Sequence, residues 1–122
     1  MRHQRTGRKL GRVSSQRKAL FRTMLGSLIM KEKITTTEAK AKELKKKIDR
    51  IIGKAKKMNI PEKKLAIVRD IRSDIPLMAV KKLSDTDFIK KFESRNSGYV
   101  RIIKLAPRKT DGARMSVIEF VD

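Results

Sequence analysis

The sequence contains no cysteine and no tryptophan, and it has one histidine and one tyrosine. Without cysteine the chain forms no disulfide and offers no thiolate to a metal, so it needs no oxidising compartment. The only imidazole belongs to His3, which leaves no histidine pair to bind zinc. Because aromatic residues make up only 4% of the chain, the hydrophobic core must be built mainly from aliphatic side chains.

Acidic residues are also scarce, since 13 Asp and Glu stand against 33 Lys and Arg and give a formal net charge of +20. Such a chain is stabilised by a polyanion, because each phosphate that it neutralises releases condensed counterions. The charge therefore predicts nucleic acid as the partner, with an anionic membrane surface or an acidic protein as alternatives. The longest apolar run, residues 24–30, is far shorter than the roughly 20 residues that span a bilayer. We expect a cytoplasmic protein without a membrane-spanning helix.

Residues 1–13 have no sustained apolar period and predict an extended basic arm. Gly7 and Gly11 lower its helix propensity and allow the backbone to approach a partner closely. A guanidinium group can bind phosphate through two hydrogen bonds and can stack on a base. The arm carries four such groups, on Arg2, Arg5, Arg8 and Arg12. We interpret it as an RNA-binding or DNA-binding arm; a solubilising tail and an organelle transit peptide are the alternatives.

The segment from residue 14 to residue 93 has the pattern of helices. Apolar residues at spacings of three and four predict helices over 15–31 and 37–57. Pro61 suits the first turn of a third helix, and a fourth follows it. The candidate capping residues are Ser14 or Ser15, the threonine run 35–37, in which Thr35 has capping-box spacing with Glu38, and Ser73 or Asp74.

The pattern changes near the C-terminus. Two β-rich segments, residues 99–106 and 115–121, flank a turn and predict a hairpin within residues 98–122. Because a lone hairpin is marginal in water, it must pack on the helices, and the β-branched segment at Ile34 is the candidate for a further strand. We therefore predict one α+β domain over residues 14–122, with about four helices packed on a small antiparallel sheet.

The sequence carries no catalytic pattern. Most acidic residues lie beside Lys or Arg, where ion pairing on a helix surface is the simplest interpretation, and the Lys45–Lys47 run favours a solvated face. The segment 7–12 lacks the spacing and the Lys-Ser/Thr ending of a phosphate-binding loop. We expect no enzyme, no cofactor, no metal site and no small-molecule substrate. Tyr99 is a candidate phosphate contact, but with so few aromatic residues, recognition of shape and backbone fits better than base stacking.

Three segments of the sequence resemble one known family, that of the bacterial large-subunit ribosomal protein L17. Its opening is similar to MRHQRTGRKLGRVSSQRKALFRTMLGSLI, its internal signature to ITTTEAKAKELKKKID, and its C-terminal hairpin to SGYVRIIKLAPRKTDGARMSVIEFVD. The resemblance covers the chain from end to end, with the segments in the family's order. The family usually has other residues at five positions of this chain, namely Gln16, Ser97, Val100, Thr110 and Arg114.

The resemblance implies a small α+β protein lodged in large-subunit ribosomal RNA, near the exit of the nascent-chain tunnel and beside other ribosomal proteins. It would be a cytoplasmic structural constituent of the large ribosomal subunit that binds and stabilises rRNA through its arm and basic helix faces. A nucleoid-type, non-specific DNA-binding protein is the alternative. The candidate rRNA-binding residues are Arg2, His3, Arg5, Arg8, Lys9, Arg12, Ser15, Arg17, Lys18, Arg22, Lys40, Lys42, Tyr99 and Arg101.

Overall fold

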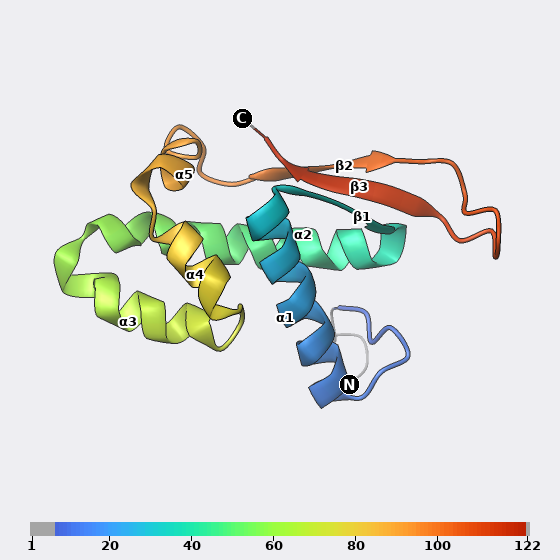
Figure 1. Cartoon of the computed structure of the whole chain (residues 1–122), viewed down its shortest axis with the longest axis horizontal. Helices are drawn as coiled ribbons and strands as arrows, with labels where there is room; N and C mark the ends of the chain where they lie inside the picture. Colours follow the sequence, from blue (N-terminus) through green and yellow to red (C-terminus); the bar gives the residue numbers. More distant parts are fainter. Residues whose placement is uncertain (1–6, 122) are drawn as a thin grey trace.

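The computed structural model describes residues 7–121. Over these residues the elements are α1 (Ser14–Lys31), β1 (Lys33–Thr37), α2 (Glu38–Ala55), the 3₁₀ helix η2 (Lys56–Asn59), α3 (Pro61–Arg72), α4 (Leu77–Leu83), α5 (Thr86–Lys90), β2 (Val100–Lys104) and β3 (Met115–Phe120). The sheet forms one layer, α2 runs along one face of it, and α1 crosses α2 (Figure 1). The predicted α+β class is confirmed, with α5 as a helix beyond the four expected.

The long helix α2 joins the helical layer to the sheet. Its apolar residues recur at helical spacing, so they form one continuous stripe along an 18-residue helix, while its lysines lie around that stripe. Burial of this stripe supplies the centre of the hydrophobic core. The buried apolar residues are Ala41, Leu44, Ile48, Ile51, Ile52 and Ala55.

The sheet has the strand order β1-β3-β2, and both pairings are antiparallel. The strand predicted near Ile34 is therefore confirmed as the third strand. Ile118 of β3 lies opposite Ile34 and Ile102, and all three pack in or against the core. Because successive residues of a strand point to opposite faces, the neighbouring row lies on the outer face. That row consists of Lys33, Glu119 and Arg101.

α1 and α4 begin at other residues than the predicted caps, whereas the N-cap residue of α2 is the last threonine of the predicted run. The N-cap residues of α1, α2 and α4 make no side-chain cap hydrogen bond and are Val13, Thr37 and Pro76. Thr35 cannot form the predicted capping box with Glu38 because it lies inside β1, opposite Val117. Pro61 does occupy the first turn of α3, as predicted. At the start of α2, tertiary pairing thus overrides the local capping pattern.

The arm is attached to α1, and a close contact with the start of α4 holds α1 in place. Gly26 is buried in α1, and a Cβ atom built on it would lie only 2.7 Å from Cγ of Pro76. A glycine at this position therefore lets the backbone of α1 approach the proline ring. The orientation of α1, and with it the point where the arm leaves the domain, depends on this contact.

Candidate nucleic-acid interface

The structure places the predicted site residues in different environments. Arg2, His3 and Arg5 lie outside the described residues. Seven of the others are exposed, namely Arg8, Lys9, Ser15, Lys18, Arg22, Lys42 and Arg101. Three are partly buried, namely Arg12, Arg17 and Lys40, and one is buried, Tyr99.

The described part of the arm, residues 7–13, turns back onto the domain rather than running straight. Gly7, Leu10 and Gly11 have positive φ angles of 97°, 55° and 65°, a region that glycine adopts freely and leucine rarely. The turn is held because Leu10 packs against the core. Arg12 also donates from Nη1 to the carbonyl of Leu10 at 2.8 Å. The sequence pattern did not predict this turn, because a single apolar residue carries no period.

An ion pair joins the arm to α2. Arg8 donates from Nη1 to Oε1 of Glu43 at 3.2 Å, and Nζ of Lys46 lies 3.5 Å from the same oxygen. Glu43 is only 6% exposed, whereas the side chain of Arg8 is 45% exposed. Arg8 thus has one end of its guanidinium against a buried carboxylate and the rest of the side chain open to a partner.

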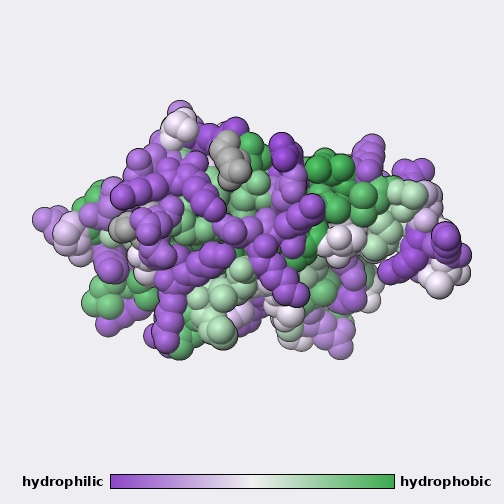
Figure 2. All heavy atoms as spheres, turned by 45° about the horizontal axis from the view of Figure 1, so that its top comes forward, coloured by the Kyte–Doolittle hydropathy of each residue, from purple (hydrophilic) through white to green (hydrophobic). Residues whose placement is uncertain are grey.

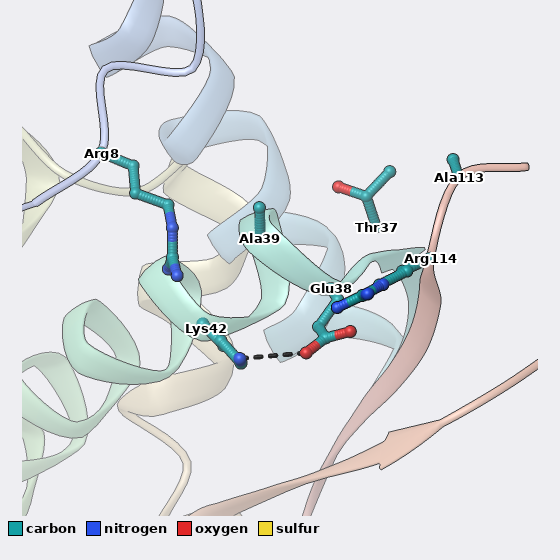
Figure 3. A pocket seen from close by; sticks show the side chains of 7 residues that line it. All are labelled: Arg8, Thr37, Glu38, Ala39, Lys42, Ala113 and Arg114. Atoms are coloured by element: carbon teal, nitrogen blue, oxygen red, sulfur yellow. Dashed lines mark ion pairs between the residues drawn. The ribbon is translucent and has the colours of Figure 1, made fainter. Parts of the chain in front are cut away.

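A concavity of about 310 Å³ lies where the arm, the start of α2 and the end of the hairpin loop meet. Its cations are Arg8, Lys42 and Arg114, and Figure 3 shows Lys42 and Arg114 beside Glu38, with Arg8 farther away. The pKa of Glu38 is lowered because Lys42 donates a hydrogen bond to its carboxylate and because Lys104 and Arg114 add positive charge. Glu38 therefore stays ionised and paired, and the cations outnumber it. The concavity suits a further anion.

Two more concavities collect cations beside α1. One, of about 430 Å³, lies between α1 and β1, and its cations are Lys31, Lys33 and Lys40. The other, of about 270 Å³, lies between α1 and α2, and its cations are Lys18, Lys47 and Arg50. Lys40 and Lys42 therefore line different concavities, although both belong to the first turns of α2. The basic surface is spread over several hollows rather than gathered in one stripe.

Two exposed arginines of the predicted set already have partners within the chain. Arg22 donates from Nη1 to the carbonyl oxygens of Arg72 and Ser73, at 3.0 and 3.3 Å, at the end of α3. Arg101 donates from Nε to Glu119 at 2.7 Å on the outer face of the sheet. Figure 2 shows hydrophilic side chains over most of the face that it draws, with a hydrophobic patch over the sheet. The outer face of the sheet is therefore less suited to RNA than the concavities.

The structure contradicts the prediction that Tyr99 is an exposed phosphate contact. It is 2% exposed, and its hydroxyl donates to the carbonyl of Asn96 at 3.0 Å. Its ring packs edge-on against Phe92, with 5.6 Å between ring centroids. A single tyrosine beside a glycine loop has the pattern of a surface residue. Here the ring is buried in the core, and its hydroxyl donates a hydrogen bond to a backbone carbonyl. Tyr99 therefore belongs to the core rather than to the exposed surface.

The sequence pattern missed the cations that complete the concavities. Arg114 reaches α2 only because its carbonyl accepts the backbone N–H of Glu38 at 2.9 Å, a contact that no local pattern reveals. Lys47 belongs to a run that favours a solvated face, yet its Nζ lies 4.8 Å from the ring centroid of Phe21. This cation-π contact directs Lys47 toward α1.

The chemistry that these residues support is the binding of phosphate at several points. Within the described residues, no group of three or more His, Cys, Asp and Glu side chains is placed to hold a metal. Among the helices of the same part of the chain, none is both long enough and apolar enough to cross a membrane.

Comparison with known proteins identifies the family. A family model described as "Ribosomal protein L17" matches residues 20–121. Among the similar proteins named "Large ribosomal subunit protein bL17", that of Limosilactobacillus fermentum is 42% identical over 123 residues, covering 93% of this chain and 98% of the relative. Its namesake from Shouchella clausii is 45% identical over 117 residues, covering 93% and 97%, and that from Chlorobium limicola is 45% identical over 122 residues, covering 100% and 78%. The chain therefore belongs to the ribosomal protein L17 family.

Proposed function

We propose that the chain is a structural constituent of the large ribosomal subunit, where it binds and stabilises large-subunit rRNA and contacts neighbouring ribosomal proteins in the cytoplasm. Family membership supports the ribosomal role, because relatives that match over nearly their whole length are named large ribosomal subunit proteins. The observation that carries rRNA binding is the concavity at the start of α2. There the arm, the helix and the hairpin each contribute one cation, Arg8, Lys42 and Arg114.

This concavity suits an RNA phosphate for two reasons. Its position at the start of an 18-residue helix adds the positive end of the helix dipole, which favours anions. Arg8 and Arg114 also carry guanidinium groups, which can bind phosphate oxygens in pairs. We expect the phosphate to displace water rather than the ion pairs, since Arg8 and Lys42 keep exposed donors after pairing with Glu43 and Glu38.

The protein would recognise the shape and backbone of the RNA. Within residues 7–121 the exposed large hydrophobic side chains include no aromatic ring, so this part of the chain offers no platform for stacking bases. Phosphates that approach the three concavities at once would instead fix the orientation of the domain between RNA helices.

The test compares two double variants that remove the same charge. Lys42→Ala with Arg114→Ala removes two cations from the concavity, whereas Lys63→Ala with Lys64→Ala removes two exposed cations from α3. Affinity for deproteinised large-subunit rRNA is measured by filter binding over a series of salt concentrations. The concavity variant should bind roughly tenfold more weakly. The slope of the logarithm of its affinity against the logarithm of salt concentration should be smaller in magnitude by about 1 to 2, in line with the loss of up to two phosphate contacts. The α3 variant should change both quantities much less.

Equal effects of the two double variants would contradict the proposed surface. Equal affinity for duplex DNA and for rRNA would contradict the ribosomal role and favour the nucleoid-type alternative. Crosslinks from the protein to a few fixed rRNA sites support the proposal, and crosslinks scattered over bulk RNA would count against it.

We also propose that the chain divides into an arm, residues 1–13, and a domain, residues 14–122. Replacing Arg5, Arg8 and Arg12 by Ala should leave the helical circular dichroism nearly unchanged, because all three residues precede α1. The same variant should weaken rRNA binding and flatten its salt dependence. A large loss of helical signal would mean that the arm is part of the folded core.

A further inference from the structure

We infer that Glu43 is a positioning residue that holds the arm in the conformation that binds RNA, an inference that rests on the proposed function. Glu43 is the one acidic residue that is buried within residues 7–121. It pairs with Arg8, which lines the concavity where the cations Arg8, Lys42 and Arg114 gather. A carboxylate in that position repels phosphate, so its presence calls for another role.

The buried carboxylate of Glu43 needs cations close to it. An ionised carboxylate that loses its water is stable only when cations and hydrogen bonds replace that water. Lys46 supplies one cation from the same helix, at 3.5 Å, and its side chain is 65% exposed. Arg8 supplies the other from the arm, at 3.2 Å, with the only hydrogen bond to Glu43 that the structure describes. The buried charge therefore favours the arm conformation that brings Arg8 to it.

The backbone of the arm also runs next to Glu43. A Cβ atom built on Gly7 would lie 3.8 Å from Oε2 of Glu43, so the backbone of the arm passes directly over the carboxylate. Gly7 has a φ of +97°, which a residue with a side chain rarely adopts. The glycine thus allows the chain to turn at the point where Arg8 must reach down to α2.

Other contacts extend this order along the arm. The N–H of Arg12 donates to the carbonyl of Lys9 at 3.2 Å, and Nη1 of Arg17 donates to the carbonyl of Arg12 at 3.2 Å. Leu10 packs against the core between these contacts. An arm that is already ordered loses less conformational entropy on binding than a free one, so its affinity for RNA is higher. Glu43 is at one end of this ordered segment and Arg17 is at the other.

Removing the charge of Glu43 distinguishes a positioning role from simple electrostatics, because the two predict opposite changes in rRNA affinity. Glu43→Gln removes a negative charge from a surface that binds phosphate, so simple electrostatics predicts tighter binding to rRNA. A positioning role predicts the opposite, a loss of about three- to tenfold, which is the effect of having to order one or two side chains on binding. Glu62→Gln removes the same charge from the exposed start of α3 and should leave the affinity unchanged or slightly higher.

The experiment measures two quantities on the full chain. Filter binding gives the affinity for deproteinised large-subunit rRNA and for a single-stranded homopolymer, and hydrogen exchange of the backbone N–H groups of residues 8–12 in free protein gives the order of the arm. We expect Glu43→Gln to speed exchange in the arm and to weaken rRNA binding, while homopolymer binding holds or increases. Arg8→Gln breaks the same ion pair by changing the exposed partner instead of the buried one. It should speed exchange to a similar extent, and it provides the exchange test if Glu43→Gln fails to fold.

Unchanged exchange in both variants would overturn the positioning role, as would an increase in rRNA affinity for Glu43→Gln that matches Glu62→Gln. Faster exchange without any loss of rRNA affinity would also overturn it, because the order of the arm would then have no effect on binding. Failure of the wild-type chain to bind rRNA would instead contradict the proposed function, and the exchange measurement would still report whether Glu43 orders the arm.

Discussion

The carboxylate of Asp49, in the middle of α2, accepts a hydrogen bond from the backbone N–H of Tyr99 at 3.1 Å, immediately before β2 begins. The hydroxyl of Tyr99 meanwhile donates to the carbonyl of Asn96. The first bond holds the loop before β2 against the helix, and the second closes the loop on itself. The hairpin is therefore tied to α2 at its entry as well as through its buried face.

Asp49→Ala should lower the free energy of unfolding by about 1 to 3 kcal/mol, because it leaves the partly buried N–H of Tyr99 without an acceptor. Asp49→Asn keeps an acceptor oxygen at the same position and should lose less. Urea denaturation followed by circular dichroism measures both changes. Equal losses for the two variants would show that the charge of Asp49, and not its hydrogen bond, is what matters.

Two glycines in helices should respond to alanine with opposite signs. Gly26→Ala places a Cβ atom 2.7 Å from Pro76, so it should destabilise the fold by about 1 to 3 kcal/mol through overpacking. Gly53→Ala in α2 meets no heavy atom within 4 Å, so it should stabilise the fold by about 0.5 to 1 kcal/mol through helix propensity. Thermal denaturation of the two variants checks the pair, and a stabilised Gly26→Ala would contradict the close contact of α1 with Pro76.

Truncation of the α2 stripe should be far more costly than truncation at the surface. Ile48 is fully buried, so Ile48→Ala should lower the free energy of unfolding by about 2 to 5 kcal/mol. Leu65 on α3 is 61% exposed, so Leu65→Ala should change the free energy of unfolding by less than about 1 kcal/mol. Urea midpoints of the two variants give the comparison. A similar loss at both positions would mean that another surface buries Leu65.

The hairpin loop contains a carboxylate that titrates well below the ordinary range. Asp111 has its pKa lowered from 3.8 to about 2 because Arg108 donates hydrogen bonds to it and because it accepts the N–H of Ala113. Since the folded pKa is depressed, the stabilisation from Asp111 is present above pH 3.8 and is lost as the pH falls toward about 2.

Carboxyl NMR titration checks the position of this midpoint. Arg108→Gln should raise the midpoint of Asp111 toward 3.8, because it removes the largest cause of the shift. Lys109→Gln removes the neighbouring cation of the loop, which makes no hydrogen bond to Asp111 in the structure, and should leave the midpoint nearly unchanged. Equal shifts in the two variants would assign the effect to general charge rather than to the Arg108 hydrogen bonds.

Local pattern predicts most of the fold, and tertiary contacts decide the rest. The stripe from Ala41 to Ala55 is buried as its spacing predicts, since an amphipathic helix of this length has one way to cover its apolar face. The helix starts were predicted less well. Thr35 has the spacing of a capping residue but belongs to β1, and Pro76 rather than Ser73 precedes α4. Pairing of β1 with a distant strand is invisible to a rule that considers four residues.

The candidate site was predicted in part for a similar reason. Charge and residue type pick out Arg8 and Lys42, but the approach of Arg114 depends on where an antiparallel hairpin returns. Glu43 was missed because the sequence shows it as one of several acidic residues beside lysines. Only its burial distinguishes it from acidic residues such as Glu62, which stays exposed.

The central place of β3 in the sheet has a consequence for the order in which the protein folds during its own synthesis. β1 leaves the ribosome long before β3, the only strand with which it pairs over the described residues. Until then water alone satisfies the hydrogen-bonding groups of β1 that later face β3, whereas α1 and α2 can already pack on each other. The newly made chain therefore completes its helical half first, and β3 closes the sheet as the final step.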